Sequence, residues 1–179
     1  EAVGATASNL NRHPDREARA LRQALADYLG HGVTPEMVWA ANGSNEVMTH
    51  VLSAFGGPGR SVLSFTPTYS MYPEYARNTH TAYLTVPRKP DHTLDAPLVL
   101  DAIAQHGPTV VVITTPNNPT GTPTPLGVIL DVLAGTDPIV VVDEAYKAFA
   151  QDPRATSLAL LHDRGNRLML RTRSKAVTF

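Results

Sequence analysis

Two uninterrupted runs of β-branched apolar residues constrain the fold of this chain more than any other feature of its sequence. Val110-Val111-Val112-Ile113 and Ile139-Val140-Val141-Val142 contain no polar residue at alternate positions. A strand with this pattern is buried on both faces, which is typical of a parallel sheet between two layers of helices. In such open sheets, ligands bind beyond the carboxyl ends of the strands. The residues that follow each run are therefore the first candidates for a functional site.

Other segments fit the same architecture, because stretches of strand length alternate with helical ones. The sequence predicts a three-layer α/β sandwich with a mostly parallel sheet. Further strands are predicted at residues 61–65, 82–86 and 168–170, and helices at residues 71–78, 95–105 and 126–134. Two earlier helices are predicted, one opening at Pro14 and Asp15 with the apolar stripe Ala18, Leu21, Leu25, Tyr28 and Leu29, the other starting near Ser44 or Asn45 with Val47, Val51, Leu52 and Phe55 inward.

Composition narrows the classes of function. The 15 Lys and Arg residues balance 16 Asp and Glu residues, so no basic face indicates a nucleic-acid partner. Cysteine is absent, which excludes a disulfide framework and any thiolate metal site. The apolar runs are too short to span a bilayer, and the first residues do not resemble a signal peptide, so we expect a cytoplasmic protein. We also expect no bound metal. Because the chain begins without Met and ends just after Lys175, we also expect a fragment.

Asp143 directly follows the second apolar run. A carboxylate at the mouth of a buried strand is costly unless it has a cationic or protonated partner, so we expect one. A helix cap or a structural ion pair would explain Asp143 equally well. The four apolar residues followed by Asp143 and Glu144 also resemble a Walker B strand, which would bind magnesium in a nucleotide hydrolase.

The hydrolase alternative requires a phosphate-binding loop, and the nearest match is weak. Residues 56–61 (GGPGRS) lack the lysine of the P-loop motif. They also follow a predicted helix and precede a predicted strand, which is the reverse of the strand–loop–helix order that the motif needs. The sequence therefore disfavours nucleotide hydrolysis.

Polar or aromatic residues follow three more predicted elements. Residues 115–121 (TPNNPTG) come after the first apolar run, where an Asn held between prolines could donate to a ligand, although a plain turn has the same composition. Ser44 and Asn45 open a helix, where they could bind a phosphate or simply cap it. Tyr69 could stack on a planar ring or lie in the core. Lys175 could act as an amine nucleophile or lie on the surface.

Taken in order, these segments resemble the fold-type I aminotransferases, which depend on pyridoxal 5′-phosphate (PLP). The resemblance rests on residues 116–121 (PNNPTG), 143–146 (DEAY) and 174–176 (SKA). Residues 39–46 (WAANGSNE) and 54–61 (AFGGPGRS), together with 12–15 (RHPD), resemble the histidinol-phosphate aminotransferase family within that group. The resemblance extends over nearly the whole chain and implies the large, PLP-binding domain, in part, with the small C-terminal domain and the extreme N-terminus outside residues 1–179.

The resemblance also implies catalytic roles. Lys175 would be the Schiff-base lysine that later moves the substrate proton, and Asp143 would pair with the ring nitrogen of PLP. Asn118 and Tyr146 would hydrogen-bond the ring 3′-oxygen. Tyr69 would stack on the ring.

Four residues would contact the cofactor phosphate by the same resemblance. Ser44, Asn45 and Ser174 would hold it within the subunit, and His13 would reach the cofactor of the neighbouring subunit in a homodimer. The family usually has Tyr at the position of His13, and Leu or Met at that of Arg173. His13 can still donate a hydrogen bond.

The implied reaction moves an amino group between glutamate and an imidazole keto phosphate, giving histidinol phosphate and 2-oxoglutarate in histidine biosynthesis. Three alternatives remain open at this point: an aromatic aminotransferase, a PLP decarboxylase that acts on a phosphorylated amino acid, and a non-catalytic effector domain of a regulator. The partners expected are small molecules and a second copy of the protein, with no nucleic acid and no membrane.

Overall fold

The structure is a computed structural model that describes residues 4, 7, 11–150, 156–160 and 165–175. The chain forms two compact units, Glu1–Ala40 and Ala41–Phe179. Within the described residues, no helix combines the length and the apolar character needed to cross a bilayer.

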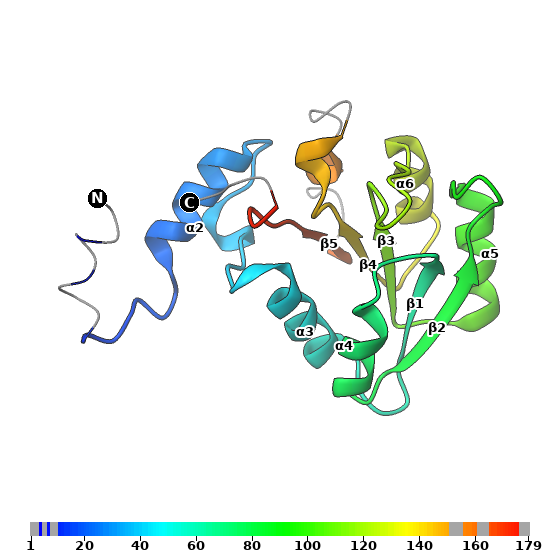
Figure 1. The fold of residues 1–179 in the computed structure, drawn as a ribbon, viewed down its shortest axis with the longest axis horizontal. Coiled ribbons are helices and arrows are strands. Elements are labelled where there is room, and N and C mark those ends of the chain that lie inside the picture. Colours follow the sequence, from blue (N-terminus) through cyan, green and yellow to red (C-terminus); the bar gives the residue numbers. More distant parts are fainter. Residues whose placement is uncertain (1–3, 5–6, 8–10, 151–155, 161–164, 176–179) are drawn as a thin grey trace. The chain divides into compact units, whose positions relative to one another are not determined.

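The larger unit is built on one parallel sheet whose strand order is β2-β1-β3-β4-β5 (Figure 1). The bounds of its strands are Ser61–Thr66 for β1, Ala82–Pro87 for β2, Val110–Thr114 for β3, Ile139–Asp143 for β4 and Arg167–Leu170 for β5. Its helices are α3 at Gly43–Phe55, α4 at Tyr72–Asn78, α5 at Ala96–His106 and α6 at Leu126–Ala134, with short 3-10 turns at Lys147–Phe149 and Ser157–Leu160. The predicted three-layer α/β sandwich is confirmed.

Alternation along the strands places two hydrophobic clusters on opposite faces of the sheet. In β3, Val111 and Ile113 join the cluster that includes α5 and α6, whereas Val110 and Val112 join the cluster that includes α3 and α4. Successive side chains of a strand point to opposite faces, so an all-apolar strand supplies both clusters. This arrangement explains the uninterrupted runs in the sequence.

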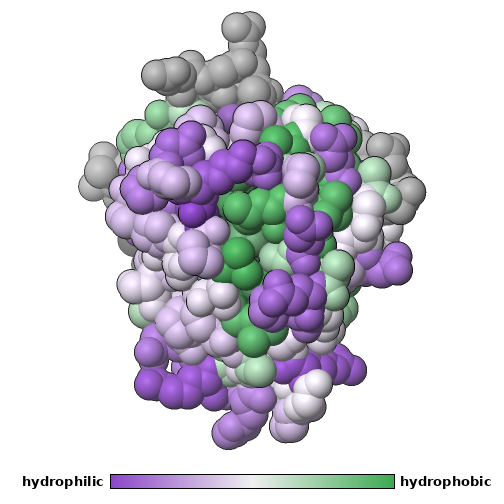
Figure 2. Space-filling view, turned by 90° about the vertical axis from the view of Figure 1, so that its right-hand side faces the viewer, coloured by the Kyte–Doolittle hydropathy of each residue, from purple (hydrophilic) through white to green (hydrophobic). Residues whose placement is uncertain are grey.

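The sheet is less well covered at β2, its edge strand. Leu84 and Val86 are only half-buried, as is Leu98 of the neighbouring α5. Figure 2 shows the side of the molecule that carries these elements, where apolar side chains form an elongated strip between polar ones.

The order of the strands creates a switch point between β1 and β3. The chain moves outward from β1 to β2 and then returns to the other side of β1 to form β3. The segments that follow β1 and β3 therefore diverge, and the crevice between such segments is where open parallel sheets bind ligands.

The smaller unit contains α2, Arg19–Leu29, and a 3-10 turn at Pro35–Met37. Arg22 joins them through a hydrogen bond of 2.8 Å from its Nε to the carbonyl of Pro35. The predicted start of this helix at Pro14 and Asp15 is wrong by several residues. The Asp15 carboxylate instead accepts from the backbone amide of Arg19.

The predicted apolar stripe of α2 does not form a core in the described structure. Leu21 and Tyr28 are 52% and 66% exposed, and Ala26 is the buried residue of the helix. A single helix and one short turn cannot enclose an apolar face. The periodicity of the sequence predicted the helix correctly but not the burial of its stripe.

Candidate functional site

A cavity of about 270 Å³ lies at the carboxyl ends of the strands in the larger unit. It brings together eight of the nine site residues predicted from the sequence. Its lining includes Ser44, Asn45, Tyr69, Asn118, Asp143, Tyr146, Ser174 and Lys175. The ninth, His13, is an exposed residue of the smaller unit, and its predicted role concerns a neighbouring subunit.

Asp143 ends β4 and is only 5% exposed. Its Oδ2 accepts a hydrogen bond of 2.6 Å from the hydroxyl of Tyr72, and its Oδ1 accepts one of 3.0 Å from the amide of Ala145. Burial raises the pKa of the Asp143 carboxyl above its ordinary value of 3.8, although these two hydrogen bonds oppose the rise. Within the described residues, the side chain that donates to Asp143 is the neutral hydroxyl of Tyr72.

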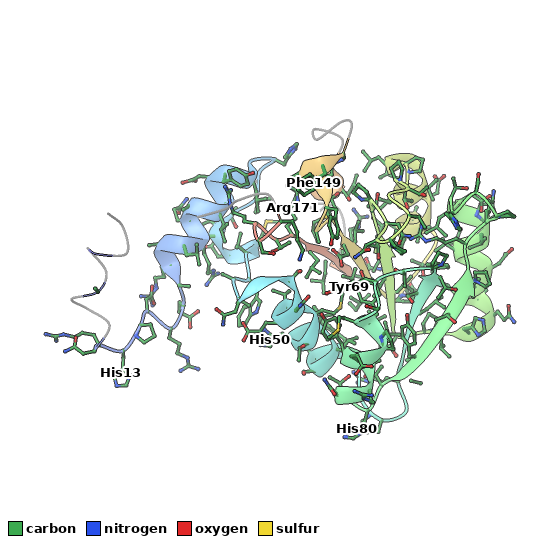
Figure 3. The ribbon with its side chains drawn as sticks, in the orientation of Figure 1. His13, His50, Tyr69, His80, Phe149 and Arg171 are labelled. Atoms are coloured by element: carbon green, nitrogen blue, oxygen red, sulfur yellow. The ribbon has the colours of Figure 1, made fainter. Side chains whose placement is uncertain are left out.

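Tyr69 and Tyr72 belong to the segment that follows β1. Tyr69 lies in the loop before α4, as Figure 3 shows, and its ring meets that of Tyr72 edge to face with centroids 5.6 Å apart. Tyr72 is 2% exposed and its pKa is raised by burial and by the neighbouring Asp143. The sequence offered no signal for Tyr72 beyond its position three residues after Tyr69.

The two asparagines in the turn after β3 have different surroundings. Asn117 is 2% exposed, and its side-chain amide donates to the carbonyl of Pro67 at 3.0 Å and to Thr120 Oγ1 at 2.8 Å. Asn117 therefore fastens the turn to the loop after β1. Asn118 lines the cavity instead, with its Nδ2 3.5 Å from Tyr146 Oη.

Helix α3 begins at Gly43, so Ser44 and Asn45 lie in its first turn and not at the N-cap. The N-cap residue Asn42 makes no side-chain capping bond, and its backbone amide donates to Glu46 Oε2 at 2.6 Å. Neither Ser44 nor Asn45 therefore acts as the N-cap of α3. Because first-turn amides have no acceptor within the helix, this end of α3 can bind an anion at the cavity.

The segment that follows β5 supplies the amine. Arg171 directly follows β5, and Thr172, Ser174 and Lys175 come after it. The hydroxyls of Thr172 and Ser174 are 2.9 Å apart, and both Ser174 and Lys175 are exposed side chains that line the cavity. An amine and a buried carboxylate therefore share one cavity, as the sequence predicted.

Glu144, next to Asp143, has a different environment that sequence reasoning did not anticipate. It is 3% exposed and accepts hydrogen bonds from Arg171, Thr156 and Ser157. Burial alone would raise the pKa of Glu144, but the bonds from Ser157 and Arg171 outweigh that effect and lower it below 4.5. Glu144 lines a second cavity of about 720 Å³.

The glycine-rich segment of the hydrolase alternative lies far from these carboxylates along the strands. It precedes β1, so it lies at the amino edge of the parallel sheet, whereas Asp143 lies at the carboxyl edge. A phosphate loop must follow the carboxyl end of a strand to act with a Walker B carboxylate. The geometry therefore contradicts a nucleotide-hydrolase site built from these two segments.

Comparisons with known proteins agree with the sequence and the geometry. The family model "Aminotransferase class I and II" matches residues 4–179. Histidinol-phosphate aminotransferases from Thermobifida fusca and Paenarthrobacter aurescens are each 51% identical over 98% of this chain. The chain spans about half the length of these curated relatives, 49% and 48%.

A solved structure also shares the fold. The crystal structure of histidinol-phosphate aminotransferase from Sinorhizobium meliloti in complex with pyridoxal-5′-phosphate matches with a TM-score of 0.85 at 23% identity. The match covers 96% of this chain and 46% of that one. At this identity the likeness shows the fold alone.

Proposed function

This chain belongs to the aminotransferase class I and II family, and on that premise we propose that it forms the cofactor-binding part of a PLP-dependent aminotransferase. The observation that carries the proposal is the cavity that Asp143 and Lys175 share. The proposed reaction is amino transfer between histidinol phosphate and 2-oxoglutarate in histidine biosynthesis. The identity of 51% to relatives of that name supports this choice of substrates.

The residues of the cavity fit PLP by their chemistry. A buried carboxylate at Asp143 suits a protonated ring nitrogen, and the first turn of α3 with Ser44 and Asn45 suits a phosphate. Tyr69 offers an aromatic face for the ring. Lys175 offers a primary amine for the aldehyde.

When bound, PLP supplies an electron-accepting ring that stabilises negative charge at the substrate Cα. The chain's own residues would do the rest. Lys175 Nζ would take the proton from the substrate Cα and deliver it to C4′ of the cofactor. Asp143 would hold the ring nitrogen in its protonated form, and Asn118 and Tyr146 would hydrogen-bond the ring 3′-oxygen. Ser174 would add a hydroxyl to the phosphate site.

The assembly of the protein is part of the same proposal. We propose a homodimer in which His13 contacts the cofactor phosphate of the neighbouring subunit, and a cytoplasmic location. We also propose that the chain is part of the large domain, with a small domain in the sequence beyond it. The coverage of about half of each relative supports this division.

The experiment that tests the proposed function is chemical trapping. The protein should bind PLP with a visible absorbance band, and borohydride should fix the cofactor on Lys175, as read by peptide mass spectrometry. Lys175→Ala should abolish the fixation. Lys147→Ala, at a lysine that lines the second cavity, is the matched control and should leave the fixation unchanged.

Three outcomes would contradict the proposal. Covalent fixation that survives Lys175→Ala would remove the assigned lysine. Fixation without amino transfer by the protein that contains residues 1–179 would favour an effector domain. Release of carbon dioxide instead of amino transfer would favour a decarboxylase.

A further inference from the structure

A row of hydroxyl groups leads to the Asp143 carboxylate. Tyr72 Oη lies 2.6 Å from Asp143 Oδ2 and 2.8 Å from Thr114 Oγ1. Thr114 Oγ1 lies 3.3 Å from Thr68 Oγ1. We call Thr68, Thr114 and Tyr72 the hydroxyl chain. Its members come from the loop after β1, the end of β3 and the start of α4.

The direction of each hydrogen bond follows from the number of protons available. An ionised carboxylate can only accept, so Tyr72 must donate its single proton to Asp143. Tyr72 can then only accept from Thr114, and Thr114 in turn can only accept from Thr68. Every hydroxyl donates toward the carboxylate, and aligned bonds of this kind polarise and strengthen one another.

The aligned hydrogen bonds matter for the charge of Asp143 because these groups are buried. Asp143, Tyr72 and Thr114 are 5%, 2% and 3% exposed. At this depth water contributes little to stabilising a charge, and an ionised carboxylate needs donors from the protein. The bonds that the structure shows at Asp143 come from a hydroxyl and a backbone amide, both of which are neutral.

Neutral donors stabilise an anion without cancelling its charge. A guanidinium in the place of Tyr72 would hold Asp143 equally well, but it would leave no net negative charge for a ligand. The hydroxyl chain therefore leaves the full charge of Asp143 facing the cavity, where a cationic group can use it.

We propose that the hydroxyl chain positions the Asp143 carboxylate and keeps it anionic for the ring nitrogen of the cofactor, an inference that rests on the proposed function. Tyr72 is the principal positioning residue of the chain, because it donates directly to Asp143. Thr114 acts through Tyr72. Arg88 steadies this point of the fold by donating to the carbonyl of Thr114 at 3.4 Å and to that of Phe65 at 3.1 Å.

The decisive measurement compares the affinity of two cofactors for Tyr72→Phe, which removes only the hydroxyl. Loss of a charge-assisted hydrogen bond should weaken the binding of PLP about tenfold or more. The analogue in which carbon replaces the ring nitrogen cannot use the charge of Asp143. Its affinity should therefore be the same for Tyr72→Phe and for the unmodified protein, which also shows that the variant is folded.

The matched control is Tyr83→Phe. Tyr83 Oη makes a hydrogen bond of the same length, 2.6 Å, to Ser64, and Tyr83 does not line the cavity. This variant also loses one tyrosine hydroxyl bond within the larger unit. It should bind PLP like the unmodified protein.

The second link is tested at Thr114. Thr114→Val removes the hydroxyl and should weaken PLP binding about threefold, a smaller effect because it acts through Tyr72. Thr114→Ser keeps the hydroxyl and should restore the affinity. In an Asp143→Asn background, Tyr72→Phe should have almost no further effect, since there is no charge left to support.

Two results would overturn the inference in distinguishable ways. If the unmodified protein does not bind PLP, the proposed function fails and the positioning role fails with it. If PLP binds tightly but Tyr72→Phe has the same affinity for PLP as the Tyr83→Phe control, the hydroxyl chain does not act through the charge of Asp143. The same conclusion follows if Tyr72→Phe weakens the binding of the nitrogen-free analogue as much as the binding of PLP.

Discussion

Asp143 and Glu144 are consecutive residues with almost the same burial, 5% and 3% exposed, yet their surroundings differ completely. Asp143 accepts from one hydroxyl and one amide, and burial raises its pKa. Glu144 accepts from Arg171, Thr156 and Ser157, and these bonds lower its pKa despite the burial. Burial favours the neutral form of both carboxylates, so the opposite directions of their pKa shifts follow from the number and charge of their hydrogen-bond partners.

The difference separates a structural carboxylate from a binding one. Glu144 joins the end of β4 to Arg171 and to residues 156–157, so it fixes the segment that leads to Lys175. The negative charge of Glu144 is paired with the guanidinium of Arg171. The charge of Asp143 is stabilised but not neutralised, which costs folding free energy and leaves the group ready for a cation.

The largest expected effect on stability comes from Arg171→Met, which removes the cationic partner of Glu144. Glu144 would then be a buried charge without its cation, and the free energy of unfolding should fall by about 3–5 kcal/mol. Urea denaturation measures the loss. Arg77→Met is the control, because Arg77 forms an exposed ion pair with Glu74 whose removal should cost less than about 1 kcal/mol.

A loss at Arg171→Met as small as that of Arg77→Met would contradict the comparison. It would mean that the hydroxyls of Thr156 and Ser157, with the backbone amide of Ser157, are sufficient to support the Glu144 carboxylate. Glu144 would then resemble Asp143, and the contrast between them would be one of degree.

Asp143→Asn tests the binding side and should act in the opposite direction on stability. The amide keeps one oxygen for the backbone amide of Ala145, and its NH2 can donate to the Tyr72 hydroxyl, which then donates to Thr114. The substitution also removes a charge whose burial is unfavourable. The stability of the cofactor-free protein should rise by up to about 1 kcal/mol. PLP binding should weaken strongly, as followed by the visible absorbance. A clear loss of stability in the cofactor-free variant would show that Asp143 is needed for the fold.

The pH dependence sharpens the same contrast. Because the pKa of Asp143 is raised, its carboxyl binds a proton more tightly in the folded protein than in the unfolded chain. The ionised carboxylate therefore lowers the free energy of unfolding at pH values above the ordinary pKa of 3.8, and this loss vanishes below that pH. Because the pKa of Glu144 is lowered, its stabilising contribution is present above 4.5 and is lost as the pH falls.

The unmodified protein and Asp143→Asn should therefore differ in stability near neutral pH and converge as the pH approaches 3.8. Both should lose the contribution of Glu144 over the same acidic range. Urea midpoints measured across this range test the expectation. A gap between the two proteins that persists or widens in acid would contradict the raised pKa of Asp143.

Local patterns in the sequence were sufficient to predict the sheet. The strands at Val110–Thr114 and Ile139–Asp143 were predicted to within one residue, because an uninterrupted apolar run depends only on neighbouring residues. The convergence of Asp143 and Lys175 also followed, since the carboxyl ends of parallel strands meet at one edge. The burial of the α2 stripe did not follow, because it depends on what covers the helix.

The partners of the two carboxylates could not be predicted for the same physical reason. Asp143 clearly needed a donor, but Tyr72 lies 71 positions away in the chain, and only the folded sheet brings them together. Arg171 and Glu144 are 27 positions apart and have no local pattern that pairs them. Periodicity predicts which residues are buried, whereas side-chain networks depend on contacts between distant elements.

The smallest expected effect is at Tyr146, which lines both the cavity of Asp143 and that of Glu144. Its hydroxyl has a long contact of 3.5 Å with Asn118, so Tyr146→Phe should change the free energy of unfolding by less than about 0.5 kcal/mol. PLP affinity should fall, but less than in Asp143→Asn, because a neutral hydrogen bond contributes less than a charge. If Tyr146→Phe instead destabilised the cofactor-free protein as Arg171→Met does, Tyr146 would belong to the structural side, and the boundary between the two regions would lie closer to Asp143.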